Sequence, residues 1–385
     1  MRITLLILWA AAVVFWGCER SKTITGATAS GQVVSFPDTA LEDAVRSALQ
    51  EPSEPITVGD LEGITRFNGN SWGIRDLTGI EYMRSLRYLD LSSNSLDSVP
   101  QLASMTTLDT VDLDFNNVAD LSPLAEINDL KYLSVAGNGI TDIGVLSGSQ
   151  HLVWLNLDGN DVSDGSPLSS CGQLHNLQLS TNPVSDISFL TDLRLLESLS
   201  LGNCPFTDLT PVSALTSLQS LYLANTSIAD LSPISSNRFL TTLNLSQCGL
   251  TDLNPVRTLT SLEYLYLGNN SITDVEPLRN LSNLRYLALD NNQISDITML
   301  ANLRDLYYIS LSTNQITSVV PLRGILALQS LNLSANQIVD VRALDENGGL
   351  SQDDYVYLYS NPLSDSSKFF WIPRMQERGV IVEYQ

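Results

Sequence analysis

The feature that most constrains this chain is a leucine that returns every 22 residues without interruption. The series has twelve members: Leu86, Leu108, Leu130, Leu152, Leu174, Leu196, Leu218, Leu240, Leu262, Leu284, Leu306 and Leu328. A fixed period of this size is typical of a solenoid, in which each turn buries its apolar face only against its neighbours. A solenoid grows by adding turns rather than cores, so the 385 residues do not require two or three globular domains.

Each turn repeats the pattern L-x-x-L-x-L-x-x-N-x-[IL], as in residues 86–96. With the first leucine counted as position 0, apolar residues recur at positions 0, 3, 5, 10, 13, 16 and 19. Positions 3 and 5 alternate with polar residues, which predicts a short strand over positions 2 to 6. Strands of successive turns are expected to stack in parallel about 4.8 Å apart, in a sheet roughly 60 Å long.

The connections between strands carry helix-start signals. Pairs such as Ser122-Pro123 and Ser166-Pro167 match an N-cap residue followed by proline at the first helical position. Few residues follow before the next turn begins. We therefore expect single helical or 3₁₀ turns on the outer side, and no long helices.

Two polar positions recur within the apolar pattern. Position 8 is asparagine in nine turns, and a buried carboxamide can both donate and accept where the chain leaves the strand. Cys204, Thr226 and Cys248 replace it in three consecutive turns, which predicts a local stability minimum. Position 12 is aspartate in nine successive turns, from Asp120 to Asp296. We interpret these carboxylates as acceptors of backbone N–H groups at the bend, with a ladder of cation sites as the alternative.

The N-terminal end of the repeats differs from the middle, as the end of a solenoid must. Residues 33–63 are expected to form a helical cap, with Asp38 before a helix whose apolar residues have helical spacing. Those residues are Leu41, Val45 and Leu49. The solenoid is expected to cover residues 64–349, beginning with a degenerate turn that keeps the register.

Residues 350–385 are expected to form the C-terminal cap. Residues 364–378 have the pattern of a helix that is ended by Gly379, and residues 380–384 can pair as a last strand. The helix is predicted to place three apolar residues on one face: Phe369, Ile372 and Met375.

The first residues have the pattern of an export signal. Met1-Arg2 precedes an almost wholly apolar stretch over residues 3–16, and Gly17-Cys18 follows. The segment resembles a bacterial lipoprotein signal, which implies a signal peptide over residues 1–17 and lipidation of Cys18. Residues 18–32 are rich in Ser, Thr and Gly and are expected to form a flexible tether. The alternatives are ordinary cleavage after residues 27–29, which gives a secreted protein, and an uncleaved membrane anchor.

The full repeat, L-x-x-L-x-L-x-x-N-x-[IL]-x-D-[IL]-x-P-L, covers about Ile64 to Leu344. It resembles the bacterial leucine-rich repeat family with 22-residue turns, typified by internalins, and eukaryotic phosphatase-regulatory repeat proteins share the turn length. The resemblance implies an α/β solenoid: a leucine-rich repeat horseshoe with a parallel β-sheet on the concave face and short 3₁₀ or helical turns on the convex face. It also implies that partners bind the concave sheet.

The chemistry-bearing residues do not indicate an enzyme. Gly69 to Gly73 matches the nucleophile pattern G-x-S-x-G but lies inside the degenerate first turn, without the long strand and helix that the motif needs. Three cysteines are expected to be buried free thiols: Cys171, Cys204 and Cys248. His151 and His175 lack enough further ligands for a shared metal. We therefore expect no catalytic residues, no metal and no cofactor.

The formal net charge of −22 argues against nucleic-acid binding, which needs clustered Lys and Arg, and it favours a basic partner. Exposed strand positions are where a ligand would be contacted. The predicted ligand-binding residues are Tyr88, Asp112, Asp114, Tyr132, Trp154, Tyr222, Tyr264, Tyr266, Tyr286 and Tyr308. The alternative for the tyrosines is side-by-side packing within the sheet. For Asp90, Asp112 and Asp114 the interpretations are a Ca²⁺ site or solvated acids, of which we favour the second.

The sequence thus predicts a non-enzymatic, monomeric protein–protein interaction module that is lipid-anchored at the bacterial cell envelope. It would bind a protein ligand on its concave sheet and contact the membrane only through the lipid. One alternative is a glycan-binding or adhesion surface that uses the same tyrosines. Another is a structural protein of the envelope.

Overall fold

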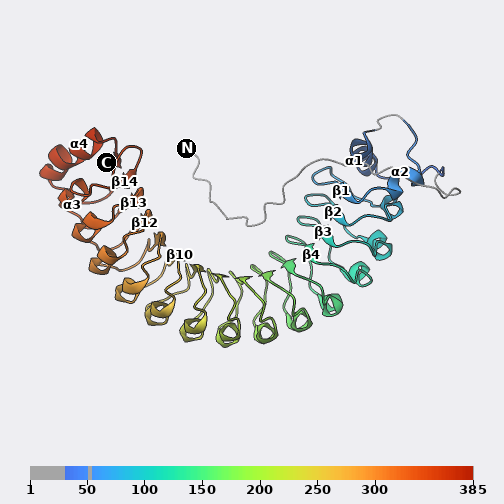
Figure 1. The fold of residues 1–385 in the computed structure, drawn as a ribbon, viewed down its shortest axis with the longest axis horizontal. Coiled ribbons are helices and arrows are strands. Elements are labelled where there is room, and N and C mark those ends of the chain that lie inside the picture. The colour runs from blue at the N-terminus through green and yellow to red at the C-terminus, as the bar shows by residue number, and fades with distance from the viewer. Residues whose placement is uncertain (1–30, 51–53, 385) are drawn as a thin grey trace.

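The computed structural model describes residues 31–50 and 54–384. Three predictions lie wholly or almost wholly outside the described residues. They are the signal peptide over residues 1–17, the lipidation of Cys18 and the flexible tether over residues 18–32. The described chain forms a curved solenoid around one parallel sheet, whose fifteen strands follow one another in sequence order. In Figure 1 the strands line the concave side of the arc and the connecting segments lie on the convex side.

The strands are three residues long. They are β1 (Arg66–Asn68), β2 (Tyr88–Asp90), β3 (Thr110–Asp112), β4 (Tyr132–Ser134), β5 (Trp154–Asn156), β6 (Asn176–Gln178), β7 (Ser198–Ser200), β8 (Ser220–Tyr222), β9 (Thr242–Asn244), β10 (Tyr264–Tyr266), β11 (Tyr286–Ala288), β12 (Tyr308–Ser310), β13 (Ser330–Asn332), β14 (Tyr355–Tyr357) and β15 (Ile381–Glu383). The repeated strands cover positions 2 to 4, so the expectation of positions 2 to 6 was wrong. The chain bends away at position 7, which has a positive φ in every turn from Ser71 to Ala335.

The convex side consists of single 3₁₀ turns, as predicted. They are η1 (Ile80–Tyr82), η2 (Pro100–Ser104), η3 (Ser122–Leu124), η4 (Gly144–Gly148), η5 (Ser166–Ser170), η6 (Ser188–Asp192), η7 (Thr210–Ala214), η8 (Ser232–Ser236), η9 (Asn254–Thr258), η10 (Glu276–Asn280), η11 (Thr298–Asn302) and η12 (Val320–Gly324). The prediction that the serine of each Ser-Pro pair is the N-cap residue was wrong by one position. Ser122 is the first residue of η3, Leu121 precedes it as the cap residue, and Pro123 is the second residue.

The aspartates at position 12 supply the missing cap interaction. The Asp120 carboxylate accepts the backbone N–H of Ser122 at 2.8 Å, and equivalent bonds recur in the other turns that carry this aspartate. The bond to Ser122 N–H lowers the pKa of Asp120 because it favours the charged form. The interpretation of these acids as backbone acceptors is confirmed.

Leucines and other apolar side chains fill the interior from end to end, and the leucines of the 22-residue series are all at most 1% exposed. The asparagines at position 8 line this core. Asn116, for example, donates to the carbonyls of Leu91 and Leu113 and accepts the N–H of Leu96, so it joins adjacent turns. This confirms the predicted role of the carboxamide.

The three replacements at position 8 make fewer bonds. Cys204 and Cys248 each donate a thiol hydrogen bond to a carbonyl of an earlier turn, whereas Thr226 donates to Leu223 of its own turn. The amides that asparagine would bind belong to Val184, Phe206 and Ile228. No acceptor for them is found among the described residues. The local stability minimum stays a prediction.

Helices close both ends of the core. At the N-terminal end, α1 (Thr39–Leu49) is capped by Asp38, which accepts the N–H groups of Ala40 and Leu41 as expected, and α2 (Val58–Glu62) follows. At the other end, α3 (Arg342–Asp345) lies against α4 (Ile372–Glu377). None of the helices in the described part of the chain has the length and apolar character that a bilayer span requires.

The expected apolar face of the C-terminal helix was wrong for one of its three residues. Ile372 and Met375 are buried, but Phe369 is 76% exposed. Residues Ser367–Trp371 form a π-helical segment, which holds more residues per turn than an α-helix. The wider turn rotates Phe369 away from the face that Ile372 and Met375 share.

Candidate ligand-binding site on the concave face

Side chains at strand positions 2 and 4 form the concave face. Position 3 is buried in every strand, whereas its two neighbours are mostly half-buried. Each repeated strand pairs with the residue 22 places further on, so equal positions of adjacent turns lie side by side. The concave face therefore displays two parallel rows of side chains, one at position 2 and one at position 4.

Five tyrosines gather over β10 to β12, and we call them the tyrosine cluster: Tyr264, Tyr266, Tyr286, Tyr307 and Tyr308. The rings of Tyr286 and Tyr308 stack with centroids 4.1 Å apart and planes 1° apart. Tyr266 lies 4.8 Å and Tyr264 lies 6.5 Å from the Tyr286 ring. The tyrosines thus pack side by side and are also presented on the concave face, so the two interpretations are compatible.

Two phenols of this cluster, Tyr266 and Tyr286, have raised pKa values and are held in their neutral form. Burial raises the pKa of Tyr266, and repulsion from neighbouring tyrosines adds to the rise. Burial and the adjacent Tyr308 raise the pKa of Tyr286 in the same way. Tyr222, on β8, is near enough to contribute to the rise at Tyr266. These phenols can therefore donate hydrogen bonds to a ligand throughout the neutral range.

The other predicted aromatics lie apart from the cluster. The guanidinium of Arg66 lies 3.9 Å from the centroid of the Tyr88 ring. Tyr132 is 46% exposed and pairs in register with Trp154 on the next strand. The strands between Trp154 and the cluster carry small polar residues at position 2: Asn176, Ser198, Ser220 and Thr242. The sequence-predicted residues therefore form two groups rather than one site.

Carboxylates accompany the N-terminal group. Asp90 and Asp112 are in register on adjacent strands. Burial, together with repulsion from Asp114, raises the pKa of Asp112 to about 7. Burial also raises the pKa of Asp114, whose carboxylate accepts hydrogen bonds from Ser134 and from a backbone amide. No group of three or more acidic, His or Cys side chains that could hold a metal ion occurs within the described residues.

Sequence reasoning missed Tyr307, Tyr355 and Tyr357. Tyr307 occupies position 1, which was not among the positions expected to be exposed. Tyr355 and Tyr357 lie on β14, where the step from Ser330 is 25 residues instead of 22. Counting by 22 therefore misses them, although the alternation of residues 355–359 has the period of a strand.

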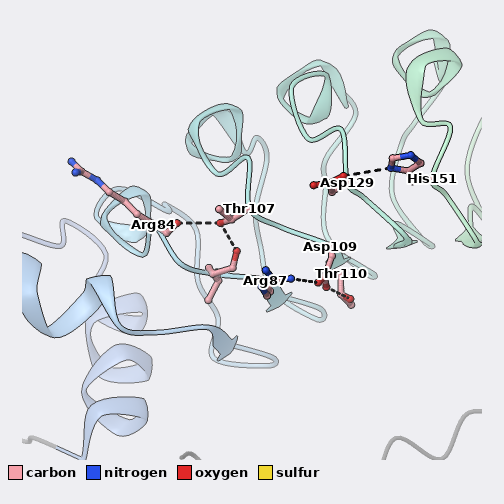
Figure 2. A network of polar contacts seen from close by, with 8 residues as sticks. Arg84, Arg87, Thr107, Asp109, Thr110, Asp129 and His151 are labelled. Carbon is pink, nitrogen blue, oxygen red and sulfur yellow. Dashed lines mark hydrogen bonds and ion pairs between the residues drawn. The ribbon is translucent and has the colours of Figure 1, made fainter. Parts of the chain in front are cut away.

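The remaining chemistry-bearing residues do not form a site. His151 pairs with Asp129 at 3.4 Å, and both side chains are exposed; a separate pair joins Arg87 to Asp109 (Figure 2). His175 instead bonds the carbonyl of Gln173. The three cysteines of the described chain are buried and free, as expected. Residues 69–73 form the turn after β1, without a helix behind the serine.

Models of the leucine-rich repeat family match much of the chain. One, for two copies of the repeat, matches residues 84–126, 194–236, 238–280, 260–302 and 282–324, and one for a single repeat matches residues 127–147. An internalin structure, InlF of Listeria monocytogenes, is 29% identical with a TM-score of 0.71, over 91% of this chain and 96% of that one. The chain is a leucine-rich repeat protein, and it is similar to internalins.

Two further proteins are similar to this leucine-rich repeat protein. Internalin H of Listeria monocytogenes is 34% identical over 79 residues, which is 20% of this chain and 14% of that protein. A leucine-rich repeat protein of Leptospira interrogans is 24% identical, with a TM-score of 0.74 over 81% of each chain. At that identity the second likeness concerns the fold alone. The predicted horseshoe with a concave parallel sheet is confirmed.

Proposed function

We propose that this leucine-rich repeat protein is a non-enzymatic module that binds a protein ligand on its concave face. The observation that carries the proposal is the tyrosine cluster of β10 to β12, whose rings are ordered by mutual contact yet remain partly exposed. A ring that is already held in place loses little entropy on binding and can bury a large area. This arrangement suits an interface better than isolated surface tyrosines would.

An acidic group over β2 to β5 supports the further proposal that the ligand is basic. Asp90, Asp112, Asp114 and Asp158 lie at or beside the strand ends of the same concave face. A ligand with basic residues opposite this group would gain favourable steering and orientation. The formal net charge of −22 acts in the same direction.

The location that we propose is the bacterial cell envelope. The lipoprotein-like signal supports export and attachment through a lipid on Cys18, and the protein would be secreted if Cys18 is not modified. Measuring the mass of the mature N-terminus tests this directly. A mass with acyl chains on residue 18 is expected, and an unmodified N-terminus further along the chain would reject the anchor.

Crosslinking in the native organism tests ligand binding. The full chain is expected to capture a discrete protein, and the double variant Tyr264→Ala with Tyr286→Ala is expected to lose that capture. Phe239→Ala is the matched control, because Phe239 is a 67% exposed aromatic residue that lies outside the strands of the concave face. Retained capture by a double variant with near wild-type thermal unfolding would reject this surface.

A glycan ligand is the alternative use of the same tyrosines. Sugar rings stack on free aromatic faces, but Tyr286 and Tyr308 cover one face of each other at 4.1 Å. That contact favours a protein ligand. An array of envelope polysaccharides that gives a signal, lost in the double tyrosine variant, would replace the protein ligand with a glycan. A structural role in the envelope would show no discrete ligand in either experiment.

A further inference from the structure

The row of tyrosines at position 2 is interrupted once near the C-terminal end of the sheet. Strands β12, β13 and β14 place Tyr308, Ser330 and Tyr355 side by side in register. Tyr286 covers one face of the Tyr308 ring, whereas the neighbour on the other side is the small Ser330. Two strand spacings separate Tyr308 from Tyr355, which is about 10 Å. We call this gap the Ser330 slot.

The far wall of the Ser330 slot is a second aromatic pair. The rings of Tyr355 and Tyr357 are 6.2 Å apart with planes within 11° of each other. Burial raises the pKa of Tyr357, and the charges of Glu383, Tyr355 and Tyr308 raise it further. Tyr308 therefore lies within electrostatic range of Tyr357 across the slot, although no ring contact in the described chain joins them.

The width of the slot fits a single planar group. Tyr286 and Tyr308 show that rings on this face stack at 4.1 Å. A planar group held between two walls at a similar spacing needs about 8 Å, which fits within the roughly 10 Å between the outer strands. The slot is thus wide enough for one flat side chain and too narrow for two.

The opposite end of the sheet shows which planar group suits this geometry. Arg66 and Tyr88 occupy position 2 on adjacent strands, and the Arg66 guanidinium stacks over the Tyr88 ring at 3.9 Å. On β13, the strand that follows Tyr308, position 2 holds Ser330, which cannot make this contact. A guanidinium is planar and weakly hydrated and stacks on aromatic faces.

Charge favours a cation over a neutral ring in the Ser330 slot. Glu383 on β15 lies in register with Tyr357 and is half-buried, and its carboxylate accepts the hydroxyl of Tyr359. Glu383 lies one strand beyond the Tyr355–Tyr357 wall, so its negative charge would attract a guanidinium in the slot at longer range. A phenyl ring would gain nothing from that carboxylate.

We infer that the Ser330 slot binds an arginine side chain of the ligand, with its guanidinium between the Tyr308 ring and the Tyr355–Tyr357 pair. This rests on the proposed function, because the slot lies on the concave face that the ligand would occupy. It goes further in naming one residue of the ligand and the place that it takes.

Capped tripeptides of the form Gly-Xaa-Gly test the assignment with the full chain. Titrations of a sample with labelled tyrosine rings are followed by NMR. The Arg tripeptide is expected to shift the Tyr308 and Tyr355 signals, and the Lys and Phe tripeptides are expected to bind at least about fivefold more weakly. Equal or tighter binding of the Phe tripeptide, or no binding of the Arg tripeptide, would overturn the assignment.

Ser330→Arg places the chain's own guanidinium in the slot and is expected to abolish binding of the Arg tripeptide. Ser198→Arg is the matched control, because Ser198 occupies position 2 of β7 between Asn176 and Ser220, with no ring beside it at that position. The control is expected to bind as the wild type does. Unchanged binding by Ser330→Arg would overturn the slot as the binding place.

The two proposals fail in different ways. If the Arg tripeptide does not bind while the double variant of Tyr264 and Tyr286 still loses ligand capture, the arginine assignment is wrong and the proposed function stands. If the double variant keeps its capture, the proposed surface is wrong, whatever the tripeptides do.

Discussion

The ring of Phe189 fills the space that Gly165 leaves in the preceding turn. A Cβ atom built at Gly165 would lie 2.2 Å from Phe189 Cε1. Gly165 occupies position 13, which carries a buried Leu, Ile or Val in the other turns from Leu77 to Val341. Phe189 occupies position 15, where proline is the commonest residue, and it is buried. The Phe189 ring of one turn therefore fills the core space that a Leu, Ile or Val at position 13 fills in the other turns.

This exchange predicts a strong coupling between the two positions. Gly165→Leu alone is expected to destabilise the protein by about 1–3 kcal/mol, because the new side chain collides with the Phe189 ring. Phe189→Pro alone is expected to cost a similar amount by leaving a cavity. The double variant is expected to recover most of the loss, since it restores the usual pair. Urea unfolding of all four proteins measures the coupling, and additive losses would contradict it.

The interrupted asparagine series predicts that a substitution can stabilise the chain. Thr226→Asn is expected to provide an acceptor for the amide of Phe206 and to raise stability by about 1 kcal/mol. Hydrogen exchange over β7 to β9 is expected to slow by a corresponding factor. Asn116→Thr is the matched reverse change and is expected to destabilise. Equal protection of all turns in the wild type would show that the three replacements do not weaken this region.

The raised pKa of Asp112 predicts that its contribution to the free energy of unfolding falls as pH rises. The pKa of Asp112 is about 7 in the folded chain, against the ordinary aspartate value of 3.8 in the unfolded chain. Between these two pH values the folded state therefore holds a proton that the unfolded state has lost. This contribution is fully present below pH 4 and is lost as pH rises through about 7, with a slope of at most about 1.4 kcal/mol per pH unit. Asp112→Asn is expected to remove it.

Urea unfolding from pH 4 to pH 8 measures this effect. The stability of Asp112→Asn relative to the wild type is expected to increase with pH. Asp120→Asn is a control for which the expected pH dependence of stability has the opposite sign. The pKa of Asp120 is lowered by its bond to the Ser122 N–H, so its contribution is present above about pH 4 and is lost as pH falls. A difference between Asp112→Asn and wild type that does not change with pH would reject the argument.

Much of the fold follows from the sequence because the 22-residue period fixes the register of the sheet. Once Leu86 and Leu108 are aligned, the packing of Tyr264, Tyr286 and Tyr308 in one row follows without further information. Departures from the period could not be predicted in this way. The 25-residue step to Tyr355 hid one wall of the Ser330 slot.

The remaining differences arise from packing between residues that are not neighbours in the pattern. The π-helical segment that exposes Phe369 depends on how the last helix fits the end of the core, which no local propensity records. The exchange between Gly165 and Phe189 involves two different positions in two turns. A repeat pattern compares only equal positions of different turns. A large residue at position 15 that compensates for a glycine at position 13 of the preceding turn can therefore be recognised only in the structure.

The C-terminal cap depends on a buried acid. The Asp345 side chain is 1% exposed, and its carboxylate pairs with Arg378 at 2.8 Å and with Arg374 at 3.4 Å. These bonds hold α3 against the residues of α4 and its end. Asp345→Ala removes these bonds but leaves two arginines that are 50% and 35% exposed, so it is expected to cost about 1.5–3 kcal/mol.

Glu346→Ala is the matched control for this prediction. Glu346 is the next residue, and its side chain is 29% exposed and pairs with Arg323 and Arg342, so its loss is expected to cost less than about 1 kcal/mol. Urea unfolding gives both losses, and hydrogen exchange of β14 and β15 reports fraying of the cap. Because the cap supports Tyr355 and Tyr357, Asp345→Ala is also expected to weaken binding of the Arg tripeptide, whereas Glu346→Ala is not. Equal losses for the two variants would show that burial of the acid contributes nothing.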